Sequence, residues 1–595
     1  MDTLKQTWEL DSIFPDGSQS AALRQMLAAL KQDISELDDC LCRENCKSAE
    51  NLKDILQRVE TISAKLVECA AFVGCLLAQN VKDSQAKVLM GEIMQLRAAL
   101  SNVDTQFDQL LVSIPDQQWQ ALLQEEWLKP IAFPVNEKRE LAAKKMEAEK
   151  EALAAELAVD GYHAWSQMYD TIIGNLSVTI MEDGQEKTFS IGQALNLLSE
   201  PDRKVRAEAF AQLKRVWQEQ EEVLAATLNH LAGFRLSLYR NRGWDDVLAE
   251  PLAVNRMSAK TLDAMWAAVN AGKPKLVKYM EQKAKLLGID KLAWYDLEAP
   301  LGAAGKKMSY DEAATYIIDK FAHFSSELAD FAQHAFTQRW IEAEDRPFKQ
   351  PGGFCTTFPL SKQSRIFSTY SGTIQGVATL AHELGHAYHS FVTRDLPFFL
   401  QDYPMNVAET ASTFGELLVV DAAIKNASSL EEKLALLDDK LQRGVAFFMD
   451  IHCRFLFETR FYQARKQGLL TVQDFNRIML EAQQEAFCDS LSEYHPYFWA
   501  AKLHFYITDV PFYNFPYTFG YLFSMGIYAR ALKEGSDFAQ RYRQLLQDTG
   551  RMTVEDLAQK HLGVDLTQPA FWEEAVSLVL RDIDEFLALC DKVRF

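Results

Sequence analysis

Two histidines flank a glutamate in the middle of the 595-residue chain, in the stretch His382-Glu383-Leu384-Gly385-His386. On a helix, a spacing of four residues places both imidazoles on one face, one turn apart. Two such rings can bind one Zn²⁺ ion at N–Zn distances of about 2.0–2.1 Å. Glu383 could then take a proton from a zinc-bound water, which is the chemistry of a metal-dependent hydrolase. Gly385, which has no side chain, could let another element or a substrate approach closely.

A catalytic zinc ion usually has three protein ligands and one open position, so a third ligand is expected elsewhere. We predict Glu409, because it lies in a largely uncharged run where a buried, isolated carboxylate would be costly. Ser412 and Glu416 follow on the same helical face. Glu416 is either an acceptor that orients a ligand histidine or an ordinary acid on a helix surface. His389 could share the face of the zinc-binding histidines, near the metal or on the cleft wall, but not as a fourth ligand.

The segment 494–521 is dense in tyrosine and holds two histidines, around Pro511 and Pro516. Tyrosine hydroxyls and histidines can donate hydrogen bonds to the oxyanion that forms during peptide hydrolysis. Aromatic residues more often belong to a core, so both roles stay open for each residue. The candidates are Tyr494, His495, Tyr497, His504, Tyr506, Tyr513, Tyr517 and Tyr521.

Glycines and small polar residues precede the histidine motif. Gly352, Gly353 and the run 369–374, with Ser371, Gly372 and Thr373, could offer backbone groups to an extended peptide. Strand addition of this kind gives affinity without dictating side chains. The alternative is that these glycines form turns.

Together these motifs resemble the thimet oligopeptidase and oligoendopeptidase F family of zinc metallopeptidases, and most closely its oligoendopeptidase F branch. HELGHAYHS is similar to that family's zinc helix, and ETASTFGE, which begins at Glu409, is similar to its glutamate helix. PGGFC and FSTYSGT look like its active-site strands, and PFYNFPYTFGYLFS looks like its aromatic substrate loop. The resemblance covers roughly residues 195–580 and is weaker in the first 190 residues.

The resemblance implies a mainly α fold, in which two helical halves enclose a deep substrate channel and a small β-sheet lies beside the zinc helix. It implies a helical N-terminal domain at 1–190 and a catalytic domain at 191–595. By motif position it favours His504, Tyr513 and Tyr517 as oxyanion donors or substrate-binding residues, with His495 and Tyr521 in reserve. The implied activity is cleavage of internal bonds in short unfolded peptides, with one Zn²⁺ per chain.

The pattern of apolar residues predicts helices along most of the chain. Helical spacing runs through 20–128, from about 137 to 159, through 191–337 and from 407 onwards, with an aromatic interruption at 495–521. Residues 176–191 alternate around an Asp-Gly pair at 183–184, which predicts a hairpin. The stretch 347–379 predicts one or two short strands leading into the helix of the histidine motif. We therefore expect an all-α protein with a small sheet beside its active site.

Composition limits the cellular setting. The net charge of −21 disfavours binding to nucleic acid. The nine cysteines are scattered, which indicates reduced thiols and not a disulfide scaffold. Neither a signal peptide nor an apolar run of about 18 residues is apparent, so we expect a cytoplasmic protein that binds oligopeptides and no membrane.

Two other functions remain open. A carboxypeptidase or dipeptidase would use the same metal chemistry, but it must recognise a terminal charge. A non-catalytic helical binding protein is disfavoured by the intact set of His382, Glu383, His386 and Glu409. Zinc is the expected metal for two imidazoles and a carboxylate, although manganese or cobalt could also support activity.

Overall fold

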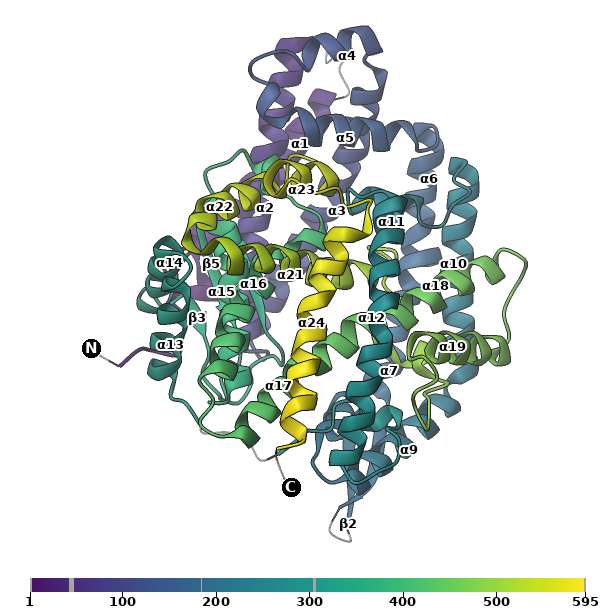
Figure 1. The fold of residues 1–595 in the computed structure, drawn as a ribbon. Coiled ribbons are helices and arrows are strands. Elements are labelled where there is room, and N and C mark those ends of the chain that lie inside the picture. The colour runs from purple at the N-terminus through teal and green to yellow at the C-terminus, as the bar shows by residue number, and fades with distance from the viewer. Residues whose placement is uncertain (1–2, 42–47, 183–184, 303–306, 593–595) are drawn as a thin grey trace. The chain divides into compact units, whose positions relative to one another are not determined.

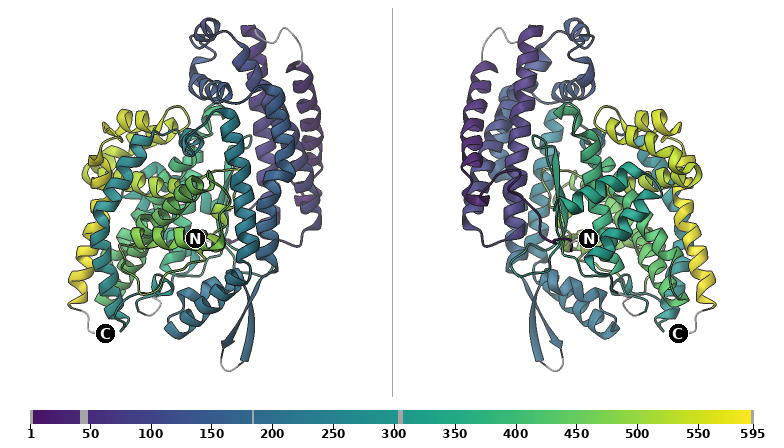
Figure 2. Two further views of the ribbon diagram at one scale, coloured as in Figure 1. Left: turned by 90° about the vertical axis from the view of Figure 1, so that its right-hand side faces the viewer. Right: turned by 90° about the vertical axis from the view of Figure 1, so that its left-hand side faces the viewer.

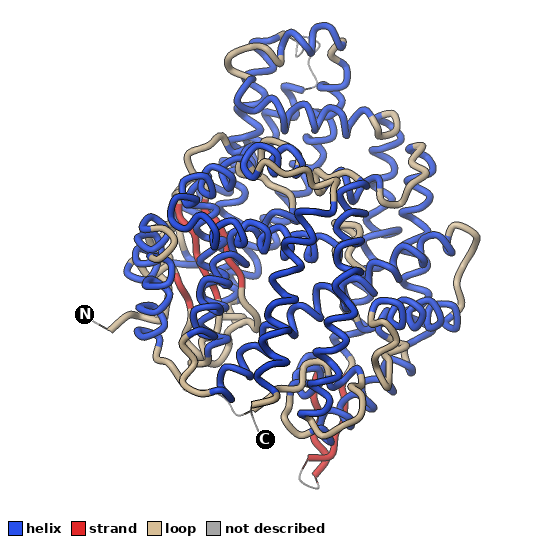
Figure 3. The backbone as a smooth tube through the Cα atoms, in the orientation of Figure 1, coloured by secondary structure: helices blue, strands red, loops and turns tan. Residues whose placement is uncertain are grey.

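The computed structural model describes the whole chain except residues 1–2, 42–47, 183–184, 303–306 and 593–595. Within that part, the chain forms 24 α-helices and five short strands (Figures 1 and 3). The strands make a two-stranded and a three-stranded sheet. The prediction of a mainly α protein with a small sheet is therefore confirmed.

The chain divides into two compact units, each built from three separate stretches. Unit 1 comprises Met1–Ala152, Gly305–Ala422 and Arg530–Gly563, and unit 2 comprises Leu153–Ala304, Ala423–Ala529 and Val564–Phe595. Three helices cross from one unit to the other: α6 (Ala148–Ala158), α16 (Met405–Lys425) and α21 (Phe515–Glu534). These units do not follow a linear division at residue 190, and the domains 1–190 and 191–595 stay a prediction.

Unit 1 begins with a helical bundle and contains the three-stranded sheet. Its other elements are α1 (Ala21–Leu41), α2 (Ala49–Gln79), α3 (Ser84–Ser113), α4 (Asp116–Leu122), α5 (Ala132–Ala143), α13 (Tyr310–Ala322), α14 (Ser326–Thr337), β3 (Ile341–Glu342), β4 (Phe354–Phe358), β5 (Gln363–Phe367), α15 (Ile374–Thr393), α22 (Ala539–Asp548) and α23 (Val554–Leu562). The long helices α1, α2 and α3 lie side by side (Figure 2). The side chains of Ser48 and Asp83 cap the N-termini of α2 and α3.

The sheet of unit 1 packs against this bundle. Its strand order is β3-β5-β4, with β3 parallel and β4 antiparallel to β5, so β4 is an edge strand. Phe358 and Phe367 belong to the same apolar core as the bundle helices. The buried carboxylate of Glu68 on α2 accepts hydrogen bonds from the backbone N–H groups of Leu360 and Ser361, at 3.0 and 3.2 Å. The turn between β4 and β5 is thereby fixed to the bundle.

Helix α2 is long and apolar enough to pass as a membrane span by composition, the single helix of the described chain to do so. Of the most apolar 18-residue stretch of α2, 67% is buried inside the protein, as in the core helix of a bundle. None of the seven described cysteines forms a disulfide.

Unit 2 is helical apart from one hairpin. Its other elements are α7 (Ala164–Asn175), β1 (Ser177–Glu182), β2 (Gln185–Ser190), α8 (Ile191–Asn196), α9 (Arg203–Glu219), α10 (Glu221–Arg242), α11 (Ala249–Val254), α12 (Ala259–Leu286), α17 (Leu430–Val445), α18 (Ile451–Arg465), α19 (Val472–Ala486), α20 (Phe498–Ala501) and α24 (Pro569–Cys590). Helices α12 and α24 run side by side (Figure 1). The predicted hairpin is present, with Ser177 opposite Ser190, whereas its Asp-Gly pair lies outside the described residues.

Two predicted boundaries are wrong. The helix expected from about 137 to 159 is broken at 144–147 into α5 and α6. The aromatic interruption at 495–521 ends earlier than expected, because α21 already begins at Phe515. Pro516 fits this first turn, where a missing N–H costs no helical hydrogen bond. Tyr517 and Tyr521 therefore lie on a helix and not in a loop.

Helices α15 and α16 cross at very short range. A Cβ atom on Gly385 would lie 2.3 Å from the Ala411 carbonyl oxygen, and one on Gly415 would lie 2.9 Å from the Ala381 carbonyl oxygen. Atoms at these separations overlap, so both positions require glycine while the helices stay this close. The close approach expected at Gly385 is therefore made by another helix.

We predict that Gly385→Ala destabilises the protein by about 1–3 kcal/mol, because its methyl group overlaps backbone atoms that cannot move without separating the helices. Chemical denaturation measures this change. Gly91→Ala is the matched control: Gly91 is exposed on α3 with no atom within 4 Å of the added Cβ, and alanine is the better helix former there. Equal stability of the two variants would contradict the tight crossing.

Candidate functional site

Helix α15 carries the histidine motif and starts at a defined residue. The side chain of Thr373 accepts a hydrogen bond from the backbone N–H of Gly376, at 3.1 Å, and so caps the helix. Val377, Leu380 and Leu384 are buried. Burial of this apolar face leaves His382 and His386, one turn apart, on the face that meets α16.

His382, His386 and Glu409 come together where α15 and α16 cross. One ligand atom from each lies within 4.8 Å of the others. His382 Nε2 is 3.3 Å from Glu409 Oε2, and His386 Nε2 is 3.6 Å from the same oxygen. Two ligands about 2.05 Å from a tetrahedral ion are about 3.3 Å apart. The separations from Glu409 to the two imidazoles thus fit those between ligands of a zinc site.

The protonation states also favour a cation. Burial lowers the pKa of His386, which keeps its imidazole neutral. Burial opposes the charge on Glu409, yet His386 and His382, with a hydrogen bond from Ser412 at 2.6 Å, hold its pKa below the usual range. A neutral imidazole and an ionised carboxylate are the forms that bind a metal.

Glu416 lies behind the first histidine. Its Oε2 is 3.2 Å from His382 Nδ1, the ring nitrogen that does not face Glu409. A carboxylate in this position can hold the ring so that Nε2 carries the free electron pair. Glu416 is 8% exposed, so the alternative of an ordinary acid on a helix surface does not describe it.

Glu383 lies beside the ligands. It is 7% exposed, and its Oε2 has no hydrogen-bond partner among the described residues. Burial raises the pKa of Glu383 to about 7; the charge of His382 lowers it and that of Glu409 raises it further. A buried carboxyl group in this range can both accept and return a proton near neutral pH.

The edge strand β4 comes next to this carboxylate. A Cβ atom on Gly353, just before β4, would lie 3.6 Å from Glu383 Oε1 and 3.1 Å from the Phe367 carbonyl oxygen. Gly352 has a φ of +93°, a conformation that favours glycine. Gly372 has a φ of +79° and lies against the carbonyl of Met308. The hydroxyl of Ser371 bonds that of Thr373, at the cap of α15.

His389 is not part of the cluster of three ligand atoms. It is completely buried, and its Nε2 lies 2.9 Å from the Thr549 hydroxyl and 3.1 Å from the Leu546 carbonyl oxygen. Its ring stacks on Tyr403 with centroids 4.1 Å apart. These contacts link α15 to α22 and do not include a metal-binding group.

Sequence reasoning missed Tyr403. Besides stacking on His389, it lies within electrostatic range of Glu409 and bonds Ser390. Burial raises its pKa above the usual range. In the sequence around Tyr403, the one distinctive residue is its neighbour Pro404. That proline indicates the start of a helix and does not indicate a role for Tyr403 in the site.

His504, Tyr513 and Tyr517 form one aromatic cluster in unit 2. Their ring centroids are 5.6 Å apart for His504–Tyr513, 6.0 Å for His504–Tyr517 and 5.6 Å for Tyr513–Tyr517. In the stretch 511–520, Tyr513 and Tyr517 are the two residues that are not buried. Burial lowers the pKa of His504 to about 4, and Arg454 and Lys502 lower it further. The cluster thus presents a neutral imidazole and two phenol groups.

The two reserve residues lie in the core of unit 2. His495 is 5% exposed and packs edge-on against Phe210 and Trp294. Tyr521 is 5% exposed and stacks on Phe447 with centroids 4.4 Å apart. Both side chains are thus largely withdrawn from solvent, and their reserve roles stay a prediction.

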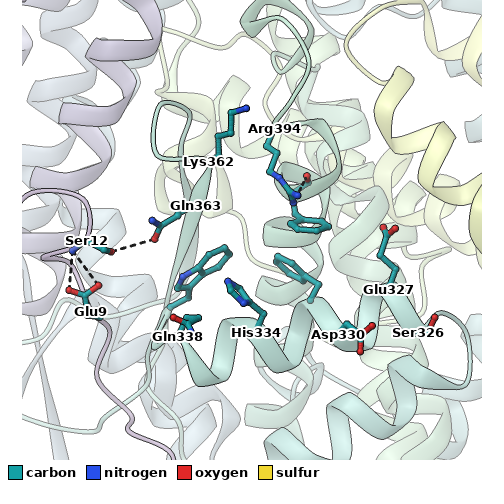
Figure 4. Close-up of a pocket in the computed structure, with 13 residues that line it drawn as sticks. Glu9, Ser12, Ser326, Glu327, Asp330, His334, Gln338, Lys362, Gln363 and Arg394 are labelled. Atoms are coloured by element: carbon teal, nitrogen blue, oxygen red, sulfur yellow. Dashed lines mark hydrogen bonds between the residues drawn. The ribbon is translucent and has the colours of Figure 1, made fainter.

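A hollow of about 720 Å³ opens at the C-terminal end of α15 (Figure 4). Lys362 and Arg394 on its wall both pair with Asp395, and Glu327 accepts a hydrogen bond from Arg543. None of the three predicted ligands lines it, so it is not the metal site. The lining residues are Glu9, Ser12, Ser326, Glu327, Asp330, Phe331, His334, Gln338, Trp340, Lys362, Gln363, Phe391 and Arg394.

Comparisons with known proteins agree on one family. The family model described as peptidase family M3 matches residues 196–578, and a model described as oligopeptidase F matches residues 111–177. The chain is 24% identical to oligopeptidase PepF of Bacillus subtilis, over 99% of this chain and 88% of that protein. It is 23% identical to the plasmid-encoded oligoendopeptidase F of Lactococcus lactis subsp. cremoris, over 99% and 98%.

Solved structures share the fold. Oligoendopeptidase F of Enterococcus faecium superimposes with a TM-score of 0.72 at 20% identity, over 96% of this chain and 99% of that one. A structure from Chlamydophila abortus reaches a TM-score of 0.82 at 20% identity, over 98% of both chains. Because the M3 model spans well over half of the chain and contains both helices of the ligand cluster, the protein belongs to peptidase family M3 and is a peptide hydrolase.

Proposed function

We propose that the protein is a zinc-dependent oligoendopeptidase that cleaves internal bonds of short unfolded peptides. One observation carries the proposal: three ligand atoms of His382, His386 and Glu409 meet beside the buried, unpartnered carboxylate oxygen of Glu383. The names of the relatives, oligopeptidase and oligoendopeptidase F, support the substrate class. The scattered cysteines, with no disulfide among the seven described, support a reducing, cytoplasmic location.

The donor set fits zinc. Two imidazole nitrogens and one carboxylate oxygen make a three-ligand site that leaves one position open. The separations of 3.3 and 3.6 Å around Glu409 Oε2 fit tetrahedral coordination. When bound, zinc supplies a Lewis acid that makes water acidic near neutral pH and polarises a carbonyl group. We propose one ion per chain.

Glu383 acts as the general base in this proposal. Its carboxylate takes the proton of the attacking water while the water oxygen bonds the peptide carbonyl carbon. It then returns the proton to the leaving amine as the C–N bond breaks. Its pKa of about 7 without metal supports both steps, because proton exchange works best when the pKa lies near the operating pH. Glu416 orients His382 through the Nδ1 contact.

His504, Tyr513 and Tyr517 donate hydrogen bonds to the peptide or to the developing oxyanion. The accessible positions of Tyr513 and Tyr517 in a stretch that is otherwise buried, with His504 beside them, support this role. A neutral histidine and phenol groups donate without adding a full charge. The extended peptide pairs with the edge of β4, and Gly353 leaves room for its backbone beside Glu383.

Glu383→Gln should keep the metal but lower kcat by about 100- to 10,000-fold, because the amide cannot accept the proton. Hydrolysis of an internally quenched peptide measures kcat, and elemental analysis measures zinc in the same sample. Zinc content equal to that of the unaltered protein separates loss of the base from loss of the ion. A variant with bound zinc and undiminished turnover would refute the general-base role.

Glu409→Ala should weaken zinc affinity by more than about 100-fold, since it removes one of three ligands. Competition with a chromogenic chelator measures the affinity. Asp421→Ala is the matched control, because Asp421 is an acidic residue on the same helix outside the ligand cluster. Unchanged zinc affinity in Glu409→Ala would remove Glu409 from the ligand set.

The exopeptidase alternative makes an opposite prediction about peptide ends. We expect a peptide blocked at both termini to be cleaved internally, with kcat/KM within about 10-fold of the free-ended peptide, because no terminal charge is needed for strand pairing. Mass spectrometry identifies the cleaved bond. Cleavage confined to free-ended peptides, with release of one or two terminal residues, would favour a carboxypeptidase or dipeptidase.

A further inference from the structure

The loop 507–514 of unit 2 joins the 3-10 helix Leu503–Phe505 to α21. It carries Tyr513, and His504 and Tyr517 flank it on either side. Buried polar side chains from outside the loop bond both of its ends. These bonds concern the aromatic cluster directly, because the loop backbone determines where Tyr513 points.

Arg235 on α10 holds the beginning of the loop. It is 3% exposed and donates hydrogen bonds to the hydroxyls of Tyr162, at 2.8 Å, and Tyr462, at 2.7 Å. It also donates to the Ile507 carbonyl at 3.3 Å, and Tyr162 donates to the Thr508 carbonyl at 3.2 Å. A buried guanidinium is costly unless its donors are occupied. Two consecutive loop carbonyls therefore depend on one arginine.

Glu458 on α18 holds the end of the loop. It is 3% exposed, and its carboxylate accepts hydrogen bonds from the backbone N–H of Phe512 and from the Asn514 amide, the latter at 3.4 Å. Arg454, from the same helix, donates to the side-chain amide oxygen Oδ1 of Asn514 at 3.4 Å. The residues on both sides of Tyr513 are thus bonded to α18.

Phe512 shows that the loop needs this support. Its φ is +53°, in the left-handed region that a residue with a side chain rarely adopts. Such a conformation persists only where surrounding contacts determine it. The Phe512 ring is buried 5.4 Å from the ring of Tyr462, itself a partner of Arg235. The backbone turn at Phe512 places Tyr513, the next residue, outside the core.

We infer that Arg235 and Glu458 are positioning residues that hold the loop 507–514 in the conformation that presents Tyr513 with His504 and Tyr517. The inference rests on the proposed function, in which these three residues donate to the substrate. A purely structural role would need no buried polar group, because apolar side chains of similar volume commonly stabilise a core as well as buried ions do. Here Arg235 and Glu458 both bond the backbone of one loop.

A double-mutant cycle tests the inference. We expect Glu458→Ala to lower kcat by about 10- to 100-fold with a smaller change in KM, since small displacements of a donor act mainly on the transition state. In a Tyr513→Phe background, the fold loss in kcat caused by Glu458→Ala should be at least threefold smaller than in the unaltered protein, because the donor is already missing. Glu458→Gln keeps one acceptor oxygen and should recover most of the lost activity.

Hydrogen exchange supplies a second readout. The amides of 507–514 should exchange faster in Glu458→Ala, while those of α15 and α16 are unchanged. Arg235→Lys, which loses donors but keeps the charge, should give the same pattern if Glu458→Ala folds poorly. Asp438→Asn is the matched control, because Asp438 is a fully buried carboxylate of unit 2 that pairs with Lys283 and not with the loop. It should lower stability without changing loop exchange or coupling to Tyr513.

The outcomes separate the two claims. Tyr513→Phe with unchanged kcat would overturn the donor role of Tyr513 in the proposed function. Equal fold losses from Glu458→Ala in both backgrounds, or unchanged exchange of the loop amides, would overturn the positioning inference alone.

Discussion

The proposed metal site depends on how closely α15 and α16 can approach. Two histidines one turn apart define one side of a metal site, but the third ligand must come from another element. Gly385 and Gly415 let the two helix backbones meet at a separation that no side chain would allow. That separation is what brings Glu409 Oε2 to 3.3 and 3.6 Å from the two imidazoles. A wider crossing would leave two isolated histidines and a buried acid without partners.

Burial then gives each group at this crossing a different property. The same desolvation that keeps His386 neutral raises the pKa of Glu383, whereas the hydrogen bond from Ser412 favours the ionised form of Glu409. The carboxylate that faces both histidines is thus suited to hold a cation, and the one without a partner is suited to move a proton. Two glutamates in one site can take separate roles because their neighbours differ.

Much of the site was predictable because helical spacing is a local property. The spacing of His382 and His386, and of Glu409, Ser412 and Glu416, places each set on one helix face without knowledge of the fold. The orientation of His389 was not predictable, since its partners Leu546 and Thr549 lie about 160 residues away in sequence. The start of α21 is not apparent from the sequence, because a proline such as Pro516 is common in loops as well as in the first turn of a helix. The division into two units, each of three stretches, depends on long-range contacts that no local pattern records.

The central claim is that the cluster of His382, His386 and Glu409 holds the zinc ion required for peptide hydrolysis. Its most direct test is a metal titration of protein stripped with a chelator and dialysed, with cleavage of a quenched peptide followed at each addition. The account predicts no turnover without metal and full recovery at one equivalent of zinc per chain. Turnover that persists in protein shown by elemental analysis to hold no zinc, manganese or cobalt would contradict it.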